Sequence, residues 1–301
     1  MSDSTADPPV LIRFPKLAAR DLEERERTLP DDFEGAFNLV LIAFRRAQQS
    51  LVDSWVSWYG TIAAEHPTLR CYEVPVLATR WSPARPVIDG GMARAVQEQE
   101  ARRRTLTVYT DVRRVTDGLA ITDTETVTAL LVDADGRVRW RTTGAPTERA
   151  GAEMLSAVGQ EVAEPDGQLP SIEQFDFVFD SRFRPLLAVA GITPGTAHVT
   201  LGPERLVARF GPWACTTPVS NVREVCITGP YRWYTAIGPR VSFVDHGLTF
   251  GTSASGGVCL LFSEPVPGIA PVSALRHPGL TLTVAEPERF AAAVRRLAGL
   301  P

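Results

Sequence analysis

An apolar segment that runs directly into a helix constrains the fold of this chain more than any other feature. Asn38–Phe44 (NLVLIAF) contains six consecutive apolar residues, which is typical of a central strand covered on both faces of a sheet. A helix is predicted over about Arg46–Glu65, because apolar residues recur there at spacings of three and four: Leu51, Val52, Trp55, Val56, Tyr59 and Ile62. His66-Pro67 ends this helix. A buried strand followed at once by such a helix predicts an α/β domain.

The segments that follow complete an alternating pattern. Predicted strands lie at about Leu69–Leu77 and Thr105–Thr110, with a Pro-rich loop and a charged helix near Met92–Arg103 between them. Val127–Val132 and Arg137–Thr142 flank Asp133-Ala-Asp-Gly136, which predicts a tight hairpin. A short helix over about Glu148–Val158 closes the unit.

The chain of 301 residues is long enough for two domains. We expect a polar tail and entry segment at 1–30, an α/β domain at 31–158, a linker at 159–172 and a β-rich domain at 173–301. In the last of these, short strands separated by Gly and Pro predict a mainly antiparallel sandwich or barrel. These strands are expected at about His198–Leu201, Leu206–Phe210, Ala214–Thr217, Val222–Thr228, Val241–Val244, Leu248–Gly251, Val258–Phe262 and Leu280–Val284. A helix near Phe183–Val189 precedes most of them, and an amphipathic helix at about Pro287–Leu297 ends the chain.

The first half resembles thioredoxin-like proteins, or redoxins. The segments that carry this resemblance are Asn38–Phe44 with its helix, and the strand–turn–strand segment Leu130–Arg141. Further segments are similar to a redox-inactive branch that includes the mitochondrial ATP synthase assembly factor family: Leu29–Phe33, Ala43–Gln49, Ile88–Met92 and Leu106–Thr110. The resemblance covers about residues 10–158 and implies a thioredoxin-like fold.

The chain departs from thioredoxins at both parts of their redox site. Thioredoxins place C-x-x-C where the first strand meets its helix, whereas this chain has Phe44-Arg-Arg-Ala-Gln-Gln49 there, with no sulfur. The cis-proline of active relatives would lie just before the strand at Val127, where this chain has Thr124-Glu-Thr126. Thioredoxin-type disulfide exchange is therefore not expected. Backbone N–H groups at a helix start can hold an anion or acidic partner, so the candidate binding residues are Arg45, Arg46, Gln48 and Gln49.

Cys71 is a weak catalytic candidate, because it lies within the second predicted strand and not at a helix start. A peroxidatic cysteine needs an electropositive and partly exposed setting, and Arg70 is the one cationic neighbour in sequence. The other cysteines, Cys215, Cys226 and Cys259, are predicted to be small core residues. None of the four cysteines forms a C-x-x-C pair, and free thiols are expected in a reducing compartment.

The second half has the element order of a pleckstrin-homology-like barrel, namely antiparallel strands followed by one amphipathic helix. It also looks like a segment of actinobacterial proteins of unknown role, through Arg209–Trp213 and Gly229–Trp233. Its best loop candidate is Tyr231-Arg232-Trp233-Tyr234, because aromatic side chains beside an arginine are typical binding anchors.

Several classes of function are disfavoured by composition and motifs. The net charge is -4 and Lys16 is the single lysine, which argues against nucleic acid and against a phosphate-binding loop. The histidines and cysteines lack metal-ligand spacing, so no metal and no cofactor are expected. Arg102–Arg104 with Arg113 and Arg114 is interpreted as a solvated face, because acidic residues lie nearby. A polar N-terminus and the lack of a long apolar run predict no membrane span and a cytoplasmic protein.

Three hypotheses follow for the function. The first is a non-catalytic binding or assembly module that recognises a protein partner or an anion, with a possible homodimer contact in the β-rich domain. The second is a divergent thiol-dependent peroxidase or redoxin that uses Cys71 and would need that thiol exposed. The third is a small-ligand sensor that uses the interior of the β-rich domain or its Tyr231–Tyr234 loop.

Overall fold

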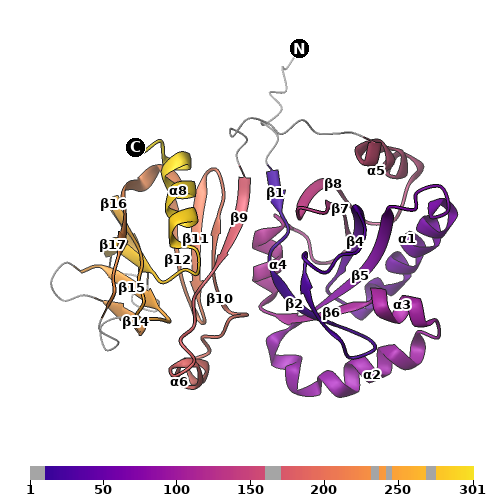
Figure 1. Ribbon diagram of the computed structural model, residues 1–301, viewed down its shortest axis with the longest axis horizontal. Coiled ribbons are helices and arrows are strands. Elements are labelled where there is room, and N and C mark those ends of the chain that lie inside the picture. The colour runs from indigo at the N-terminus through magenta and orange to yellow at the C-terminus, as the bar shows by residue number, and fades with distance from the viewer. Residues whose placement is uncertain (1–10, 160–170, 232–236, 242–245, 269–275) are drawn as a thin grey trace, which may run out of the picture. The chain divides into compact units, whose positions relative to one another are not determined.

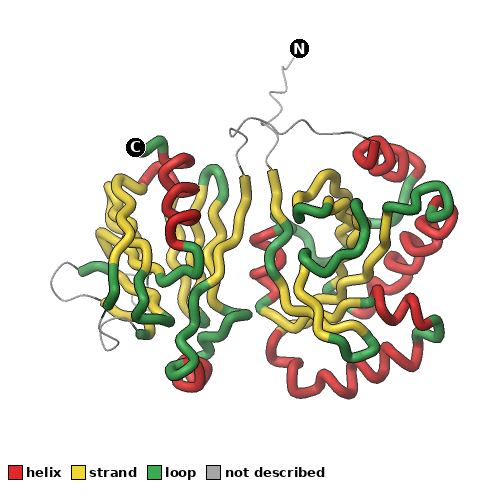
Figure 2. Tube along the Cα trace, viewed as in Figure 1, coloured by secondary structure: helices red, strands yellow, loops and turns green. Residues whose placement is uncertain are grey.

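The chain divides into two compact units, which are described separately. The computed structural model describes residues 11–159, 171–231, 237–241, 246–268 and 276–301. Leu11–Leu169 form the N-terminal unit, and Pro170–Pro301 lie in the C-terminal unit. Strands and helices alternate in the N-terminal unit, while strands dominate the C-terminal unit (Figures 1 and 2).

The N-terminal unit is built on one sheet with strand β4 (Phe37–Ala43) near its centre. The other strands are β1 (Leu11–Arg13), β2 (Leu17–Asp21), β3 (Glu26–Leu29), β5 (Leu69–Ala78), β6 (Leu106–Thr110), β7 (Thr128–Asp133) and β8 (Arg137–Thr143). Their order is β1-β8-β7-β4-β5-β6-β2-β3. Five consecutive residues of β4 are buried, which agrees with the apolar run that predicted a strand covered on both faces.

The directions of the central strands match the arrangement that the resemblance predicts. β4 and β5 are parallel and are joined by helix α1 (Gln49–Ile62), after the short 3-10 turn η1 (Arg46–Gln48). β7 pairs antiparallel with both β4 and β8, and helix α5 (Glu148–Gly159) follows β8. A parallel strand–helix–strand unit is thus joined to an antiparallel hairpin and a helix, in the order β8-β7-β4-β5.

Helices α1 and α5 cover the same face of β4 and β7, as Figure 1 shows. Val52, Trp55 and Tyr59 of α1 pack there with Ala150 and Met154 of α5. The two helices approach closely at Gly151, where a Cβ atom would lie 2.7 Å from Cζ2 of Trp58. A larger residue at position 151 would therefore have to displace the Trp58 ring.

Three expectations for the N-terminal unit are wrong. The entry segment at 1–30 contains more than a short strand, because β2 and β3 form a hairpin that pairs with β6. The single helix predicted near Met92–Arg103 is two helices, α2 (Arg85–Ala95) and α3 (Gln99–Arg104), after a 3-10 turn η2 (Thr79–Ala84). Pro86 lies in the first turn of α2, where its missing N–H costs nothing, so it starts a helix and does not mark a loop. A further helix, α4 (Val112–Gly118), was not predicted.

The C-terminal unit contains two sheets and a terminal helix. The first sheet is β9 (Ser171–Asp176), β10 (Ala197–Leu201), β11 (Arg205–Phe210) and β12 (Trp213–Pro218), each antiparallel to the next. The second has the order β13-β16-β17-β15-β14, formed by β13 (Val222–Thr228), β14 (Gly238–Val241), β15 (Leu248–Gly251), β16 (Gly257–Pro267) and β17 (Arg276–Leu282). Helices α6 (Arg184–Val189) and α8 (Pro287–Ala298) and the 3-10 turn η3 (Val219–Asn221) complete it. Side chains of both sheets and of α8 form one core.

The structure confirms a mainly antiparallel C-terminal unit and corrects some of its details. β15 and β17 are parallel neighbours, so the second sheet is mixed. β16 extends beyond its predicted end to Pro267, and β9 had been assigned in part to the linker. Most of the predicted linker and the end of the predicted strand Val241–Val244 lie outside the described residues. In the part of the chain that is described, no helix is both long and apolar enough to cross a membrane.

Candidate functional site

The end of β4 is the position where thioredoxins carry their cysteine pair. In this chain, the buried side chain of Gln48 lies at that position and is hydrogen-bonded to the backbone around it. The side chain of Gln48 is 3% exposed. Its Oε1 accepts hydrogen bonds from the backbone N–H groups of Phe44 (2.8 Å) and Arg45 (3.2 Å). Its Nε2 donates to the backbone oxygen of Thr124 at 2.8 Å. One buried amide therefore satisfies three backbone groups from two segments of the chain.

The segment just before β7 lies against this position, as the cis-proline segment does in redoxins. Besides the Thr124 contact, the carboxylate of Glu125 forms an ion pair with the guanidinium of Arg45. Both side chains are more than half exposed, so we expect this pair to contribute at most about 1 kcal/mol to stability. The two segments that hold the thiols and the proline in active relatives are joined here by hydrogen bonds and an ion pair.

The four candidate residues of this position have different roles. Gln48 is buried, so its expected amide contacts with a partner do not fit the structure; its amide is used within the chain. Arg45 is exposed and paired with Glu125. Arg46 is exposed and has no ion-pair partner among the described residues. Gln49 is also exposed and donates from Nε2 to Oδ1 of Asp53 at 2.9 Å. Arg45, Arg46 and Gln49 form the outer surface of the site, which we call the β4 edge.

Cys71 lies away from the β4 edge, on the core face of β5. Its side chain is part of the core beneath α1. Burial raises the pKa of its thiol to about 12. Because the thiolate is the nucleophile, this environment does not fit a peroxidatic cysteine.

Burial divides the four thiols into two classes. Burial raises the pKa of Cys215 to about 12 as well, and its side chain is fully buried as predicted. Cys226 and Cys259 are not core residues, which corrects the prediction: both are half-exposed, and they face each other across β13 and β16. The prediction for Cys226 is wrong because alternate residues of β13 point to opposite faces of its sheet, and a cysteine within a strand can lie on either face.

This difference predicts a simple labelling result. Iodoacetamide at pH 8 is expected to alkylate Cys226 and Cys259 in the native chain, and Cys71 and Cys215 only after denaturation. The two buried thiols are closed to the reagent, whereas Cys226 is accessible although its hydrogen bond to Glu224 raises the pKa of its thiol as well. Peptide mass spectrometry of native and denatured samples checks this. Native labelling of Cys71 at the rate of Cys226 would contradict the described burial.

The Tyr231–Tyr234 loop is only partly described. Arg232, Trp233 and Tyr234 lie outside the described residues. Tyr231 is half-buried, and its hydroxyl forms a hydrogen bond with the hydroxyl of Thr228. Its backbone N–H donates to the oxygen of Ala254 at 2.8 Å. Tyr231 is therefore held by its own unit.

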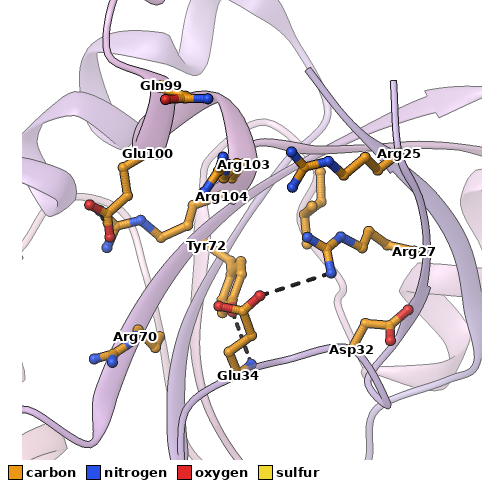
Figure 3. Close-up of a pocket in the computed structure, with 11 residues that line it drawn as sticks. Arg25, Arg27, Asp32, Glu34, Arg70, Tyr72, Gln99, Glu100, Arg103 and Arg104 are labelled. Carbon is orange, nitrogen blue, oxygen red and sulfur yellow. Dashed lines mark hydrogen bonds and ion pairs between the residues drawn. The ribbon is translucent and has the colours of Figure 1, made fainter. Parts of the chain in front are cut away.

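A pocket of about 350 Å³ lies at the opposite end of the parallel strands, beside the starts of β4 and β5 (Figure 3). We call it the arginine pocket. It is lined by five arginines, three carboxylates, a tyrosine and two further residues: Arg25, Arg27, Arg70, Arg103, Arg104, Asp32, Glu34, Glu100, Tyr72, Gln99 and Leu106. Within the described residues, no group of three or more His, Cys, Asp or Glu side chains could hold a metal ion.

Sequence reasoning missed this pocket. Arg102–Arg104 was noticed and interpreted as a solvated face, yet Arg103 and Arg104 line the pocket. Arg25 and Arg27 come from the β2–β3 hairpin, which was not predicted, and the other lining residues come from β5, α3, the start of β6 and the segment between β3 and β4. The sequence did contain one signal for this pocket. Arg25 and Arg27 are two residues apart, and side chains at this spacing in an extended segment point to the same side.

The fold and the β4 edge together define a thioredoxin-like domain that has no thiol at the redox position. Residues 11–160, which cover almost the whole N-terminal unit, match the family model described as "ATP10 protein". This match relates the domain to the ATP10 proteins and agrees with the resemblance to the ATP synthase assembly factor family. No curated protein sequence matches the chain.

Three solved structures illustrate the similarity of this chain to known structures. Yeast Sco1 with copper bound is 12% identical, with a TM-score of 0.38 over 54% of this chain and 100% of that chain. BsSco, a member of the Sco family of cytochrome c oxidase assembly proteins, is 11% identical, with a TM-score of 0.38 over 52% and 96%. A putative thiol:disulfide interchange protein DsbE from Chlorobium tepidum is 14% identical, with a TM-score of 0.35 over 52% and 100%.

Proposed function

We propose that the N-terminal unit is a non-catalytic assembly module that binds a protein partner through the β4 edge. The observation that carries this proposal is the replacement of the redox pair by the Gln48 hydrogen bonds, which leave Arg45, Arg46 and Gln49 at the surface. The family match at 11–160 supports a partner within ATP synthase assembly. Two arginines and an amide suit an acidic segment of that partner.

The charged side chains of the β4 edge contribute little to the stability of the fold, which fits a role in binding a partner. Arg46 has no described ion-pair partner, and two cations near the start of α1 oppose the helix dipole by a few tenths of a kcal/mol. An acidic partner would relieve this repulsion. The pair Arg45–Glu125 is exposed, so a carboxylate of the partner could replace Glu125 at small cost.

Site-specific photo-crosslinking tests the proposal. A benzoylphenylalanine at position 47, where the exposed Ala47 lies beside Arg46, is expected to capture an ATP synthase subunit or assembly intermediate in cells. The matched control is position 65, because Glu65 is also exposed and lies just beyond the other end of α1. Adding Arg45→Glu to the position-47 probe should reduce capture about tenfold, since a charge reversal in a charged contact costs several times RT. Equal capture from positions 47 and 65, or none from position 47, would contradict the proposal.

The two other hypotheses have less support. The thiol-dependent enzyme needs an exposed Cys71, and that side chain is buried with a raised pKa. In the described part of the C-terminal unit, the side chains of both sheets fill the interior that a small-ligand sensor would use. A sensor that uses the Tyr231–Tyr234 loop stays a prediction, because most of this loop lies outside the described residues. A pleckstrin-homology-like ancestry of this unit, a homodimer contact and a cytoplasmic location stay predictions.

A further inference from the structure

We propose that the arginine pocket binds a small anion of the phosphate class that carries at least two negative charges. The pocket and the β4 edge lie at opposite ends of β4, because Glu34 precedes this strand and Arg45 follows it. The inference therefore stands independently of the proposed function.

Donors of the pocket come from separate elements. Figure 3 shows Arg25 and Arg27 on one side of Tyr72 and Arg70 and Arg104 on the other. The guanidinium group of Arg70 donates to the backbone oxygens of Pro67 and Leu69 at 2.7 and 3.2 Å, and that of Arg104 forms an ion pair with Glu100 at 3.2 Å. The donors that can face a ligand are therefore those of Arg25, Arg27 and Arg103, together with the hydroxyl of Tyr72. They come from the β2–β3 hairpin, α3 and β5, and a tetrahedral phosphate can accept hydrogen bonds from several such directions.

Glu23 fixes two of the guanidinium groups. Its Oε2 accepts a hydrogen bond from Nε of Arg103 at 3.0 Å and forms an ion pair with Nη2 of Arg25 at 2.7 Å. The hydrogen bond from Arg103, followed by one from Gln99, holds the pKa of Glu23 below its usual value. Each guanidinium has five N–H donors, so most donors of Arg25 and Arg103 are left for a ligand. Holding both side chains beforehand lowers the entropy lost on binding.

Arg27 is the most available cation of the pocket. Its side chain is 22% exposed, so it is partly shielded from water. Its nearest carboxylate oxygens are Oδ2 of Asp21 at 3.7 Å and Oε1 of Glu34 at 3.9 Å, both beyond hydrogen-bond length. Within the described residues its guanidinium therefore has charged neighbours but makes no hydrogen bond.

Tyr72 supplies a neutral donor at the floor of the pocket. The residue is 3% exposed, and its hydroxyl accepts from the backbone N–H of Glu34 at 2.9 Å. The hydroxyl proton has no acceptor among the described residues. A buried hydroxyl with an unused proton is costly without a ligand, and a phosphate oxygen would accept that proton.

The exposed carboxylates of the pocket can make way for a dianion. Five arginines line the pocket together with Asp32, Glu34 and Glu100, and Glu23 and the buried Asp21 lie behind them, so the charges are balanced before a ligand enters. The side chains of Glu34 and Glu100 are 66% and 74% exposed, so both can turn toward water when an anion enters. The arginines would then pair with the ligand.

Isothermal titration calorimetry of the full chain with pyrophosphate tests this inference. Saturable one-site binding is expected, weakened by salt because partly exposed charges are screened. Arg27→Ala should weaken binding about tenfold or more, since a charge-assisted hydrogen bond contributes about 1.5–3 kcal/mol. Tyr72→Phe, which keeps the ring and its packing, should weaken it about threefold to tenfold.

Matched controls make the test decisive. Arg46→Ala removes the same charge at the β4 edge and should leave the affinity unchanged, and Arg27→Lys should retain part of it. Circular dichroism confirms that each variant is folded. Absence of pyrophosphate binding by the folded parent chain, tighter binding of succinate than of pyrophosphate, or equal weakening by Arg27→Ala and Arg46→Ala would overturn the inference.

Discussion

Replacement of Trp55 by alanine is expected to lower the free energy of unfolding of the N-terminal unit by about 3–5 kcal/mol. The side chain is fully buried at the centre of the core beneath α1. It packs edge-on against Trp58 and Trp140, with ring centroids 5.5 and 6.1 Å apart. Its indole N–H also donates to the backbone oxygen of Gly144 at 2.8 Å. The substitution therefore leaves a large cavity and an unpaired carbonyl group.

Hydrogen exchange under increasing urea, followed by mass spectrometry on peptides of β4, measures this loss for the N-terminal unit alone. Trp81→Ala is the control, because Trp81 is 49% exposed, and its effect should stay within about 0.5 kcal/mol. If the two substitutions had equal effects, the described core of this unit would be wrong.

Gln48→Ala is expected to destabilise the same unit by about 2–4 kcal/mol, a large effect for a polar residue. The change leaves the backbone N–H groups of Phe44 and Arg45 and the oxygen of Thr124 without their partner. Exchange at the amides of Phe44 and Arg45 should accelerate more than exchange in the middle of β4, because these two amides lose their acceptor directly.

The neighbouring glutamine provides the control for this prediction. Gln49 is exposed, and its side chain forms hydrogen bonds with Asp53 and Glu73 but with no backbone group at the end of β4, so Gln49→Ala should change stability by no more than about 0.5 kcal/mol. A Gln48→Ala protein as stable as Gln49→Ala would mean that Gln48 does not hold the β4 edge together, and the structural account of the lost redox pair would fail.

The central elements of the fold could be predicted because their signals are local. β4 is apolar except for Asn38, α1 has a regular apolar stripe, and Asp133–Gly136 turns back with Gly136 at a φ of 75°. The β2–β3 hairpin could not be predicted in this way. Its strands are short and carry charged residues, such as Arg20 and Arg27, that pair with acidic neighbours. Its position depends on pairing with β6, which is distant in sequence.

The helices between β5 and β6 were predicted wrongly for a different reason. No residue of α2 or α3 is buried, so neither has an apolar periodicity that would mark its ends. α4 could have been found, because Asp111 caps it by accepting a hydrogen bond from the N–H of Arg113 at 3.0 Å. An N-cap aspartate before a short helix was a signal that the sequence interpretation did not use.

The sequence predicts where the candidate site lies, but it does not predict the role of each residue within the site. The junction of β4 and α1 is predicted from the apolar run Asn38–Phe44 that leads directly into an amphipathic helix, and the missing cysteines show that the redox pair is absent there. That Gln48 points inward while Arg46 and Gln49 point outward depends on the backbone path through η1, which no local pattern encodes. The arginine pocket required a hairpin, β5 and α3 to meet, so it could be found only in three dimensions.

The most direct test of the account is turnover by the purified full chain with dithiothreitol as reductant, and with hydrogen peroxide or insulin disulfides as acceptor. A Cys71→Ser variant is assayed beside the parent chain. We expect no turnover above the reductant alone in either protein, because the β4 edge has no thiol and Cys71 is buried with a pKa near 12. Turnover by the parent chain that disappears in Cys71→Ser would contradict the account and would make this protein a thiol enzyme.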